Sequence, residues 1–262
     1  MGLYKKATIA NINKYVIGTL MSSSKLENAV LITGAGQRIG AYLVRQLLKN
    51  TDYPVVFTYR TEHVEVAELQ RLGAIAIQAD FTEIENLPGL VEKVSKQVCS
   101  LRAIIHNASL WLSDEQAPAG SEAYRNLFQV HVDAPHYLNG QLESLLREAS
   151  SDLKDIISIS DYSINRIRET HIGYLASKAA LRTLSQGYAK KLAPEIKVND
   201  IAPALIAFNE GDGENYKAMR LKQAAIPIEP GYEVVWQAVD YLMKSPYSTG
   251  SVLQLDGGRH LI

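Results

Sequence analysis

Hydrophobic and polar positions along the chain follow two different periods. Short apolar runs recur at 29–33, 54–59, 74–78, 103–106, 155–160, 197–201 and 252–255. Such runs are typical of parallel strands that are buried on both faces. Between several of them, apolar residues at helical spacing indicate amphipathic helices at 41–50, 86–98, 122–146, 173–192 and 234–243. Strands that alternate with helices predict a single α/β domain with a doubly wound parallel sheet.

The stretch 204–230 has no clear period. Gly211, Gly213, Pro227 and Pro230 interrupt it, and it follows the sixth predicted strand. In open α/β sheets the ligand lies at the carboxyl ends of the strands. A long irregular insert at this place predicts a lid over a substrate.

Residues 1–25 precede the first strand and do not share its pattern. Lys5, Lys6 and Lys14 surround a short apolar stretch at 15–20, which has no clear cleavage site of a signal peptide. Met21 is a second potential start residue. We expect residues 1–25 to be an N-terminal extension, disordered or absent from the native protein, and residues 26–262 to form the domain.

Composition and charge exclude several classes of protein. The 262 residues are 47% hydrophobic with a net charge of −1, which gives no reason to expect nucleic acid or a membrane surface as a partner. Cys99 is the only cysteine, so neither a disulfide framework nor a cysteine-based metal site is expected, and we predict no metal. No apolar run reaches the roughly 18 residues that a bilayer requires. The cytoplasm is the expected location.

A glycine-rich turn follows the first predicted strand. Gly34, Gly36 and Gly40 lie between that strand and the first helix. A strand, a glycine-rich turn and a helix in this order form a phosphate cradle at the helix N-terminus, as in Rossmann-type dinucleotide-binding folds. The glycines permit the tight turn and the close approach of a pyrophosphate to the backbone.

The charges near the second strand indicate which dinucleotide is bound. An NAD site has an acidic residue at the end of this strand, but here the strand ends in Tyr59 and Arg60, with no acid before Glu62. Arg38 adds a second cation inside the glycine turn. Two guanidiniums suit the 2′-phosphate of NADPH, although each would also be ordinary as a solvated surface residue. The sequence therefore favours NADPH.

Tyr174 and Lys178 are spaced for catalysis. They lie four residues apart, about one helical turn, and Asp161 precedes Tyr174 by thirteen residues. An ammonium group on the same helix face would lower a tyrosine pKa that is normally about 10. The expected result is a tyrosine that donates a proton at neutral pH, with Tyr174, Lys178 and Asp161 as catalytic residues.

These motifs together resemble the short-chain dehydrogenase/reductase superfamily from about residue 29 to the C-terminus. The resemblance rests on the glycine turn, on Asp80, on the segments 106–109, 174–178 and 198–203, and on 256–258. It implies a cofactor site made of Gly34, Gln37, Arg38, Ile39, Tyr59, Arg60, Asp80, Phe81, Asn107, Ala108, Ser109, Tyr174, Lys178 and Pro203. It also implies a homotetramer or homodimer.

A narrower resemblance comes from Asp161, which stands where most superfamily members have Ser. With Arg38, Ser109 and Trp111, this residue makes the chain similar to pteridine reductases, and most of all to bacterial dihydromonapterin reductases, which also reduce dihydrofolate. The resemblance implies NADPH-dependent reduction of a 7,8-dihydropterin that stacks against Trp111. The implied substrate residues are Ser109, Trp111, Asp161, Tyr174 and Leu205.

Two other functions remain open on the sequence. A general carbonyl or 3-oxoacyl reductase would use the same scaffold, although the carboxylate of Asp161 is a poor partner for a developing alkoxide. A non-catalytic NADPH sensor would have no need of Tyr174 and Lys178. Asp161 would also serve as a structural cap of the turn after its strand, and Trp111 as a core or interface residue.

His131 departs from the superfamily pattern. It stands where the resemblance implies an Asn that positions a proton-relay water. A histidine ring would position the same water, or it would be a buried histidine with satisfied hydrogen bonds.

Overall fold

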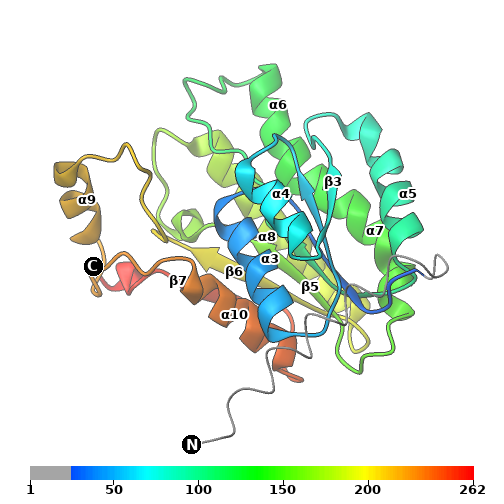
Figure 1. Cartoon of the computed structure of the whole chain (residues 1–262). Helices are drawn as coiled ribbons and strands as arrows, with labels where there is room; N and C mark the ends of the chain where they lie inside the picture. The colour runs from blue at the N-terminus through cyan, green and yellow to red at the C-terminus, as the bar shows by residue number, and fades with distance from the viewer. Residues whose placement is uncertain (1–24) are drawn as a thin grey trace, which may run out of the picture.

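The computed structural model describes residues 25–262, so the expected extension lies outside the described residues except for Lys25. Its sheet has seven parallel strands in the order β3-β2-β1-β4-β5-β6-β7 (Figure 1). The strands are β1 Ala29–Ile32, β2 Val55–Tyr59, β3 Ile75–Gln78, β4 Leu101–His106, β5 Asp155–Ile159, β6 Lys197–Pro203 and β7 Val252–Leu255. The predicted doubly wound α/β fold is confirmed, with every predicted strand in place.

Helices cover both faces of the sheet. They are α3 Arg38–Asn50, α4 Val64–Arg71, α5 Leu87–Gln97, α6 Glu122–Phe128, α7 Ala134–Arg147, α8 Ile172–Leu192, α9 Glu214–Leu221 and α10 Glu233–Lys244. The core on one face contains apolar residues of α3, α4 and α10. The core on the other face contains those of α5, α7 and α8. None of the helices in the described part is long and apolar enough to cross a membrane.

The strand sequences are apolar because the strands are covered on both faces and are inaccessible to water. Every residue of β1, β4, β5 and β6 is buried, whereas β3 and β7 at the edges are partly exposed. Burial of one large aliphatic side chain stabilises the fold by about 1.5–3 kcal/mol. The mainly apolar sequence is therefore what this position in the sheet requires, and the buried Arg102 and Lys197 are each paired with Asp155.

The order in which the chain adds strands to the sheet reverses between β1 and β4. From β1 the chain proceeds outward through β2 and β3, then crosses to β4 on the other side of β1. At such a switch point the connections diverge and leave a crevice beyond the carboxyl ends of the strands. The glycine turn after β1 and the segment after β4 both border this crevice.

The predicted helix at 122–146 is divided into three parts. A π-helical turn at Gln129–Asp133 separates α6 from α7. Pro135 lies just beyond this turn, and it has no N–H to donate to the preceding turn of a regular helix. The irregular turn carries His131 into the interior of the protein.

The stretch 204–230 is not wholly irregular, as the sequence suggested, because it contains α9. None of the residues of α9 is buried, so the helix has no apolar stripe that the sequence pattern would show. Helix α4 was also not predicted. Figure 1 shows α9 at the rim of the molecule, near the C-terminus and away from the layers of the sheet.

Candidate active site

The glycine turn lies tightly against the start of the segment after β4. Gly34 has a φ of 62°, and a Cβ atom there would be 2.5 Å from the Cα of Ala108. The side-chain amide of Asn107 donates to the carbonyl oxygens of Gly34 at 2.8 Å and Thr33 at 3.0 Å. Only glycine meets both the backbone angle and the close approach at this position. Asn107 therefore fixes the turn in place.

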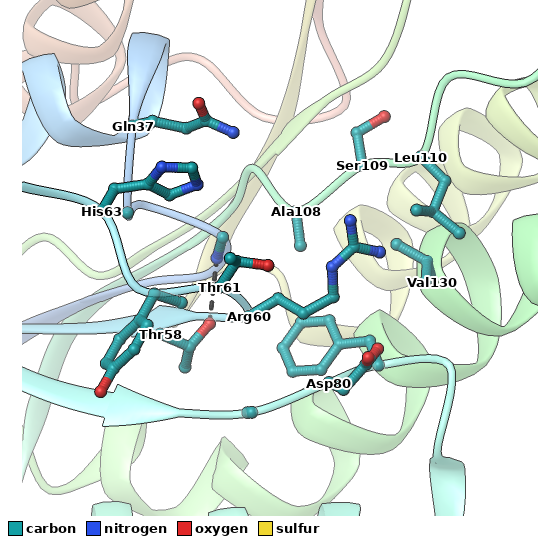
Figure 2. Close-up of a pocket in the computed structure, with 15 residues that line it drawn as sticks. Gln37, Thr58, Arg60, Thr61, His63, Asp80, Ala108, Ser109, Leu110 and Val130 are labelled. Atoms are coloured by element: carbon teal, nitrogen blue, oxygen red, sulfur yellow. Dashed lines mark hydrogen bonds between the residues drawn. The ribbon is translucent and has the colours of Figure 1, made fainter. Parts of the chain in front are cut away.

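Beyond the turn is a cavity of about 130 Å³ at the carboxyl ends of β1 to β4 (Figure 2). Among the predicted cofactor residues, its lining includes Gly34, Gln37, Tyr59, Arg60, Asp80, Phe81, Ala108 and Ser109. Thr61 and His63 also line it, and neither was predicted. Figure 2 shows the Arg60 side chain extending into the cavity toward Val130.

The residues of this cavity fit a phosphorylated dinucleotide. At the start of α3 the glycine turn exposes backbone N–H groups, and such groups at a helix N-terminus bind phosphate. At the end of β2 the lining consists of Arg60, Thr61 and His63, and no carboxylate of the described residues lines the cavity there. Asp80, at the end of β3, accepts hydrogen bonds from Thr82 that fix one of its oxygens. A cationic end of β2 suits a ribose 2′-phosphate better than a free 2′-hydroxyl.

Asp161 and Tyr174 are joined directly. The Tyr174 hydroxyl donates to Oδ2 of Asp161 at 2.9 Å, and the backbone N–H of Ser163 donates to Oδ1 at 2.6 Å. The second bond caps the 3-10 turn at Tyr162–Asn165. Arg182 donates to the Asp161 carbonyl at 3.1 Å and further fixes the segment. Asp161 is thus both a cap and a partner of Tyr174.

The predicted lowering of the Tyr174 pKa is wrong. Burial, together with the charge and hydrogen bond of Asp161, raises the pKa of Tyr174 well above its usual value. Nζ of Lys178 donates to the carbonyl of Ile159 at 2.9 Å and lies 5.9 Å from the centre of the Tyr174 ring. Burial lowers the pKa of Lys178 to about 8. Tyr174 therefore keeps its proton at neutral pH and acts as a hydrogen-bond donor.

An aromatic group forms one side of the site. Trp111 is 51% exposed, and its ring centre is 4.5 Å from that of Tyr174 and 4.3 Å from that of His171. This exposure excludes a core position for Trp111. Its flat surface beside Tyr174 is suited to a planar heteroaromatic ring.

Helix α8 is fixed at the end that carries Tyr174. The carboxylate of Asp114 accepts hydrogen bonds from the backbone N–H groups of Ile172 at 2.9 Å and Gly173 at 3.0 Å. These bonds satisfy N–H groups that a helix leaves unpaired at its first turn, and the negative charge complements the helix dipole. The sequence reasoning missed Asp114, because its position in a loop shows no periodic signal.

The family model for short chain dehydrogenases matches residues 28–216, which is more than half of the chain. The chain belongs to the short-chain dehydrogenase family. The membership that was predicted from the motifs is confirmed.

Two relatives and one solved structure are similar to this short-chain dehydrogenase over most of its length. It is 44% identical over 232 residues to the dihydromonapterin reductase of Klebsiella pneumoniae, covering 88% of this chain and 96% of the relative. The dihydromonapterin reductase of an Enterobacter strain is 43% identical over 235 residues, covering 90% and 98%. The solved structure of alternative dihydrofolate reductase 1 from Brucella canis, complexed with NADP, has a TM-score of 0.80 at 25% identity, covering 92% and 97%.

His131 of this short-chain dehydrogenase is fully buried and has a hydrogen bond at each ring nitrogen. Its Nε2 accepts the backbone N–H of Leu110 at 3.1 Å and lies 2.9 Å from the Ser109 hydroxyl. A backbone N–H only donates, so Nδ1 carries the ring proton and donates to Ser177 at 2.8 Å. The Ser177 hydroxyl donates in turn to the Tyr174 carbonyl at 2.7 Å. His131 thus joins Ser109 to the helix turn that carries Tyr174.

Several predicted residues lie away from the cavity after β1. Arg38 turns toward the loop after β6, where it donates to the Asn209 side chain and to the Ala207 carbonyl. The structure therefore does not place Arg38 beside Arg60 in the lining of this cavity. Leu205 lines a different, largely apolar cavity beneath α9. Ile39 packs against the core, and Pro203 is buried at the end of β6.

Two buried histidines predict that acid destabilises the protein. Burial lowers the pKa of His106 to about 4 and that of His131 well below its usual value. Below about pH 6.5 the unfolded chain binds protons at both positions, whereas the folded chain does not. Stability is therefore full above that pH and falls as the pH decreases toward 4, by up to about 3 kcal/mol for His106.

Urea unfolding between about pH 7 and pH 4.5 measures this loss. The slope of the free energy of unfolding against pH should decrease in His106→Gln, which removes one of the two groups. A free energy that does not change over this interval would contradict the neutral, buried state of both rings.

Proposed function

We propose that this short-chain dehydrogenase uses NADPH to reduce 7,8-dihydropterins, namely dihydromonapterin to tetrahydromonapterin and dihydrofolate to tetrahydrofolate. The observation that carries the proposal is the hydrogen bond of 2.9 Å between the Tyr174 hydroxyl and the Asp161 carboxylate. This pair lies beside the exposed ring of Trp111. A carboxylate accepts hydrogen bonds from a ring N–H or an amino group, which a pterin offers and a simple ketone does not.

The cofactor is held by backbone and cations. The glycine turn receives the pyrophosphate, Asp80 the adenine side, and Arg60 with His63 the 2′-phosphate. Lys178 of α8 places its Nζ at the carboxyl end of β5, where it would bind the nicotinamide ribose. When bound, NADPH supplies the hydride that saturates C6 of the dihydropterin while N5 gains a proton.

Tyr174, Asp161 and Trp111 position the substrate. Trp111 provides a flat face for the ring, and Ser109 and Asp161 provide polar groups at its edge. The raised pKa of Tyr174 keeps one proton between its oxygen and Asp161. Tyr174 and Asp161 therefore orient and polarise the N5 end of the ring as a hydrogen-bonded pair, and N5 gains its proton from water. Most of the rate enhancement then comes from positioning, because the hydride chemistry belongs to the cofactor.

The relatives support this assignment. The two dihydromonapterin reductases match nearly the whole described chain, and the Brucella canis structure contains NADP. The residues that carry the proposal in this chain are those that the sequence predicted as the Tyr174, Lys178 and Asp161 set.

Product analysis tests the proposed reaction. NADPH with deuterium in the transferred position is incubated with the enzyme and 7,8-dihydromonapterin. We expect a tetrahydropterin that contains one deuterium at C6. NADPH oxidation without a labelled tetrahydropterin would contradict the reaction.

Arg60→Glu is expected to reverse the preference for NADPH. The change places a carboxylate at the end of β2 and removes a charge-assisted contact, so kcat/KM with NADPH should decrease about 10-fold to 100-fold. With NADH it should remain equal or increase, because a carboxylate suits a free 2′-hydroxyl. Steady-state kinetics with both cofactors measures the change. The matched control is Arg71→Gln on the exposed face of α4, which should alter neither value. An equal decrease with both cofactors would exclude a 2′-phosphate at Arg60.

A further inference from the structure

Four arginines surround a second cavity close to the catalytic residues. The cavity has a volume of about 240 Å³, and Arg166, Arg168, Arg220 and Arg259 line it together with Tyr162 and Ser163. The arginines come from three separate segments: the loop before α8, helix α9 and the C-terminal turn. Figure 1 shows α9 and the C-terminus close together at one edge of the molecule. The fold therefore gathers four positive charges in a chain whose net charge is only −1.

None of the four guanidiniums forms a salt bridge with an Asp or Glu side chain among residues 25–262. Arg259 is buried and donates to Gln223, and Arg166 donates to the main-chain oxygen of Ile262 at 3.1 Å. Nε of Arg220 is buried and has no hydrogen-bond partner among the described residues. An unpaired buried donor is costly, so its presence indicates a ligand that would accept from it.

The four charges also act on one another. Burial and the charge of Arg168 lower the pKa of Arg220, and burial and the charge of Arg220 lower the pKa of Arg259. Burial is the larger cause in both cases, and the mutual repulsion adds to it. A bound anion would relieve this repulsion.

The cavity adjoins the candidate active site. The Arg168 guanidinium lies 5.9 Å from the centre of the Trp111 ring, and Trp111 contacts Tyr174. Ser163 lines the cavity and donates its N–H to Asp161. A substrate whose ring lies at Trp111 and Asp161 would therefore reach the arginines with a substituent that extends from the ring.

We propose that this cavity binds the anionic end of the C6 substituent of the pterin, either the glutamyl carboxylates of dihydrofolate or a phosphate group. The proposal rests on the proposed function, because it takes the pterin ring to lie at Trp111 and Asp161. The aminobenzoyl group of a folate separates its carboxylates from the ring, as the position of the cavity beyond Trp111 requires. Planar guanidiniums bind carboxylates and phosphates through paired charged hydrogen bonds. The cavity thus selects pterins with acidic side chains over neutral ones.

Kinetics of Arg220→Gln and of Arg166→Gln/Arg220→Gln test this selection. With 7,8-dihydrofolate, kcat/KM should decrease about tenfold for the first variant and further for the second, mainly through KM. With 7,8-dihydrobiopterin, whose side chain is neutral, neither variant should change kcat/KM. The matched control is Lys222→Gln, which removes an exposed charge just after α9 outside the cavity. An equal decrease for dihydrofolate and dihydrobiopterin would overturn the proposal.

A binding measurement separates this proposal from the proposed function. p-Aminobenzoyl-triglutamate, which has no reducible ring, is titrated into the NADPH-loaded enzyme by calorimetry. Binding to the wild type that is weakened in both variants supports the anion site, even if no dihydropterin is reduced. Reduction of dihydropterins with no effect of the variants on this binding overturns the site and leaves the proposed function intact.

The source of the anion follows from a third substrate. If kcat/KM of the variants decreases more with 7,8-dihydroneopterin monophosphate than with dihydrofolate, the cavity binds a phosphate. If kcat/KM decreases more with dihydrofolate, the cavity binds glutamyl carboxylates. Either result supports an anion site, whereas loss with neither substrate overturns it.

Discussion

Tyr174→Phe is expected to lower kcat for dihydropterin reduction about 100-fold or more, with the Kd of NADPH unchanged. The change removes one hydroxyl, which donates to the carboxylate of Asp161. A hydrogen-bond donor that stabilises the transition state contributes about 100-fold to 1,000-fold to a rate, and the ring of Phe still fills the buried position. Steady-state kinetics measures kcat, and fluorescence titration measures the Kd of NADPH.

The matched control for this variant is Tyr188→Phe. Tyr188 is a buried tyrosine on the same helix, α8, and its hydroxyl lies 2.9 Å from Nδ1 of His136. This change removes a comparable hydrogen bond at a position remote from the site, so kcat should remain unchanged. A Tyr174→Phe enzyme with the kcat of the control would remove Tyr174 from the mechanism.

Asp161→Ser is expected to lower kcat/KM for 7,8-dihydropterins about 100-fold. The carboxylate that accepts the hydrogen bond of the Tyr174 hydroxyl is lost, while serine still caps the 3-10 turn by accepting from the N–H of Ser163. Asp161 raises the pKa of Tyr174, so the variant should also shift any rate-controlling ionisation of Tyr174 to lower pH. The pH profile of kcat/KM measures both effects.

Activity on a simple ketone provides the control for Asp161→Ser. Most superfamily members have Ser at this position, so activity on the ketone should not decrease in parallel. A variant that reduces dihydropterins as fast as the wild type would show that Asp161 is only a structural cap. A parallel loss on both substrates, with a lower melting temperature, would show damage to the fold.

The strands could be predicted because burial on both faces requires mainly apolar sequence. Helix α9 could not, since it lies at the rim with no buried residue and has no apolar stripe. The division of the helix at 122–146 depends on Pro135, whose effect on the preceding turn is visible only in the structure. The hydrophobic pattern of a sequence indicates which residues are buried, so it does not predict a helix that is exposed on all sides.

The sequence named the members of the candidate site, but it did not contain their geometry. The spacing of Tyr174 and Lys178 placed both on one helix face, but it did not show that Lys178 donates to Ile159 or that burial and Asp161 together raise the pKa of Tyr174. Likewise, the glycine turn identified Arg38 as a cation near the cofactor, yet its side chain reaches Asn209. Side-chain directions depend on neighbours from other segments, which a local spacing does not contain.

His171 and the arginines of the second cavity had no local signal. His171 packs against Trp111 from the start of α8, and Arg220 and Arg259 come from segments that are distant from Trp111 in the sequence. Only the folded chain brings them together.

Oxidation of NADPH with 7,8-dihydromonapterin, 7,8-dihydrofolate and a simple ketone, measured side by side, tests the central claim most directly. The account predicts turnover of both pterins and little or none of the ketone. Turnover of the ketone alone would contradict it, and would make the protein a general carbonyl reductase in which Asp161 caps a turn.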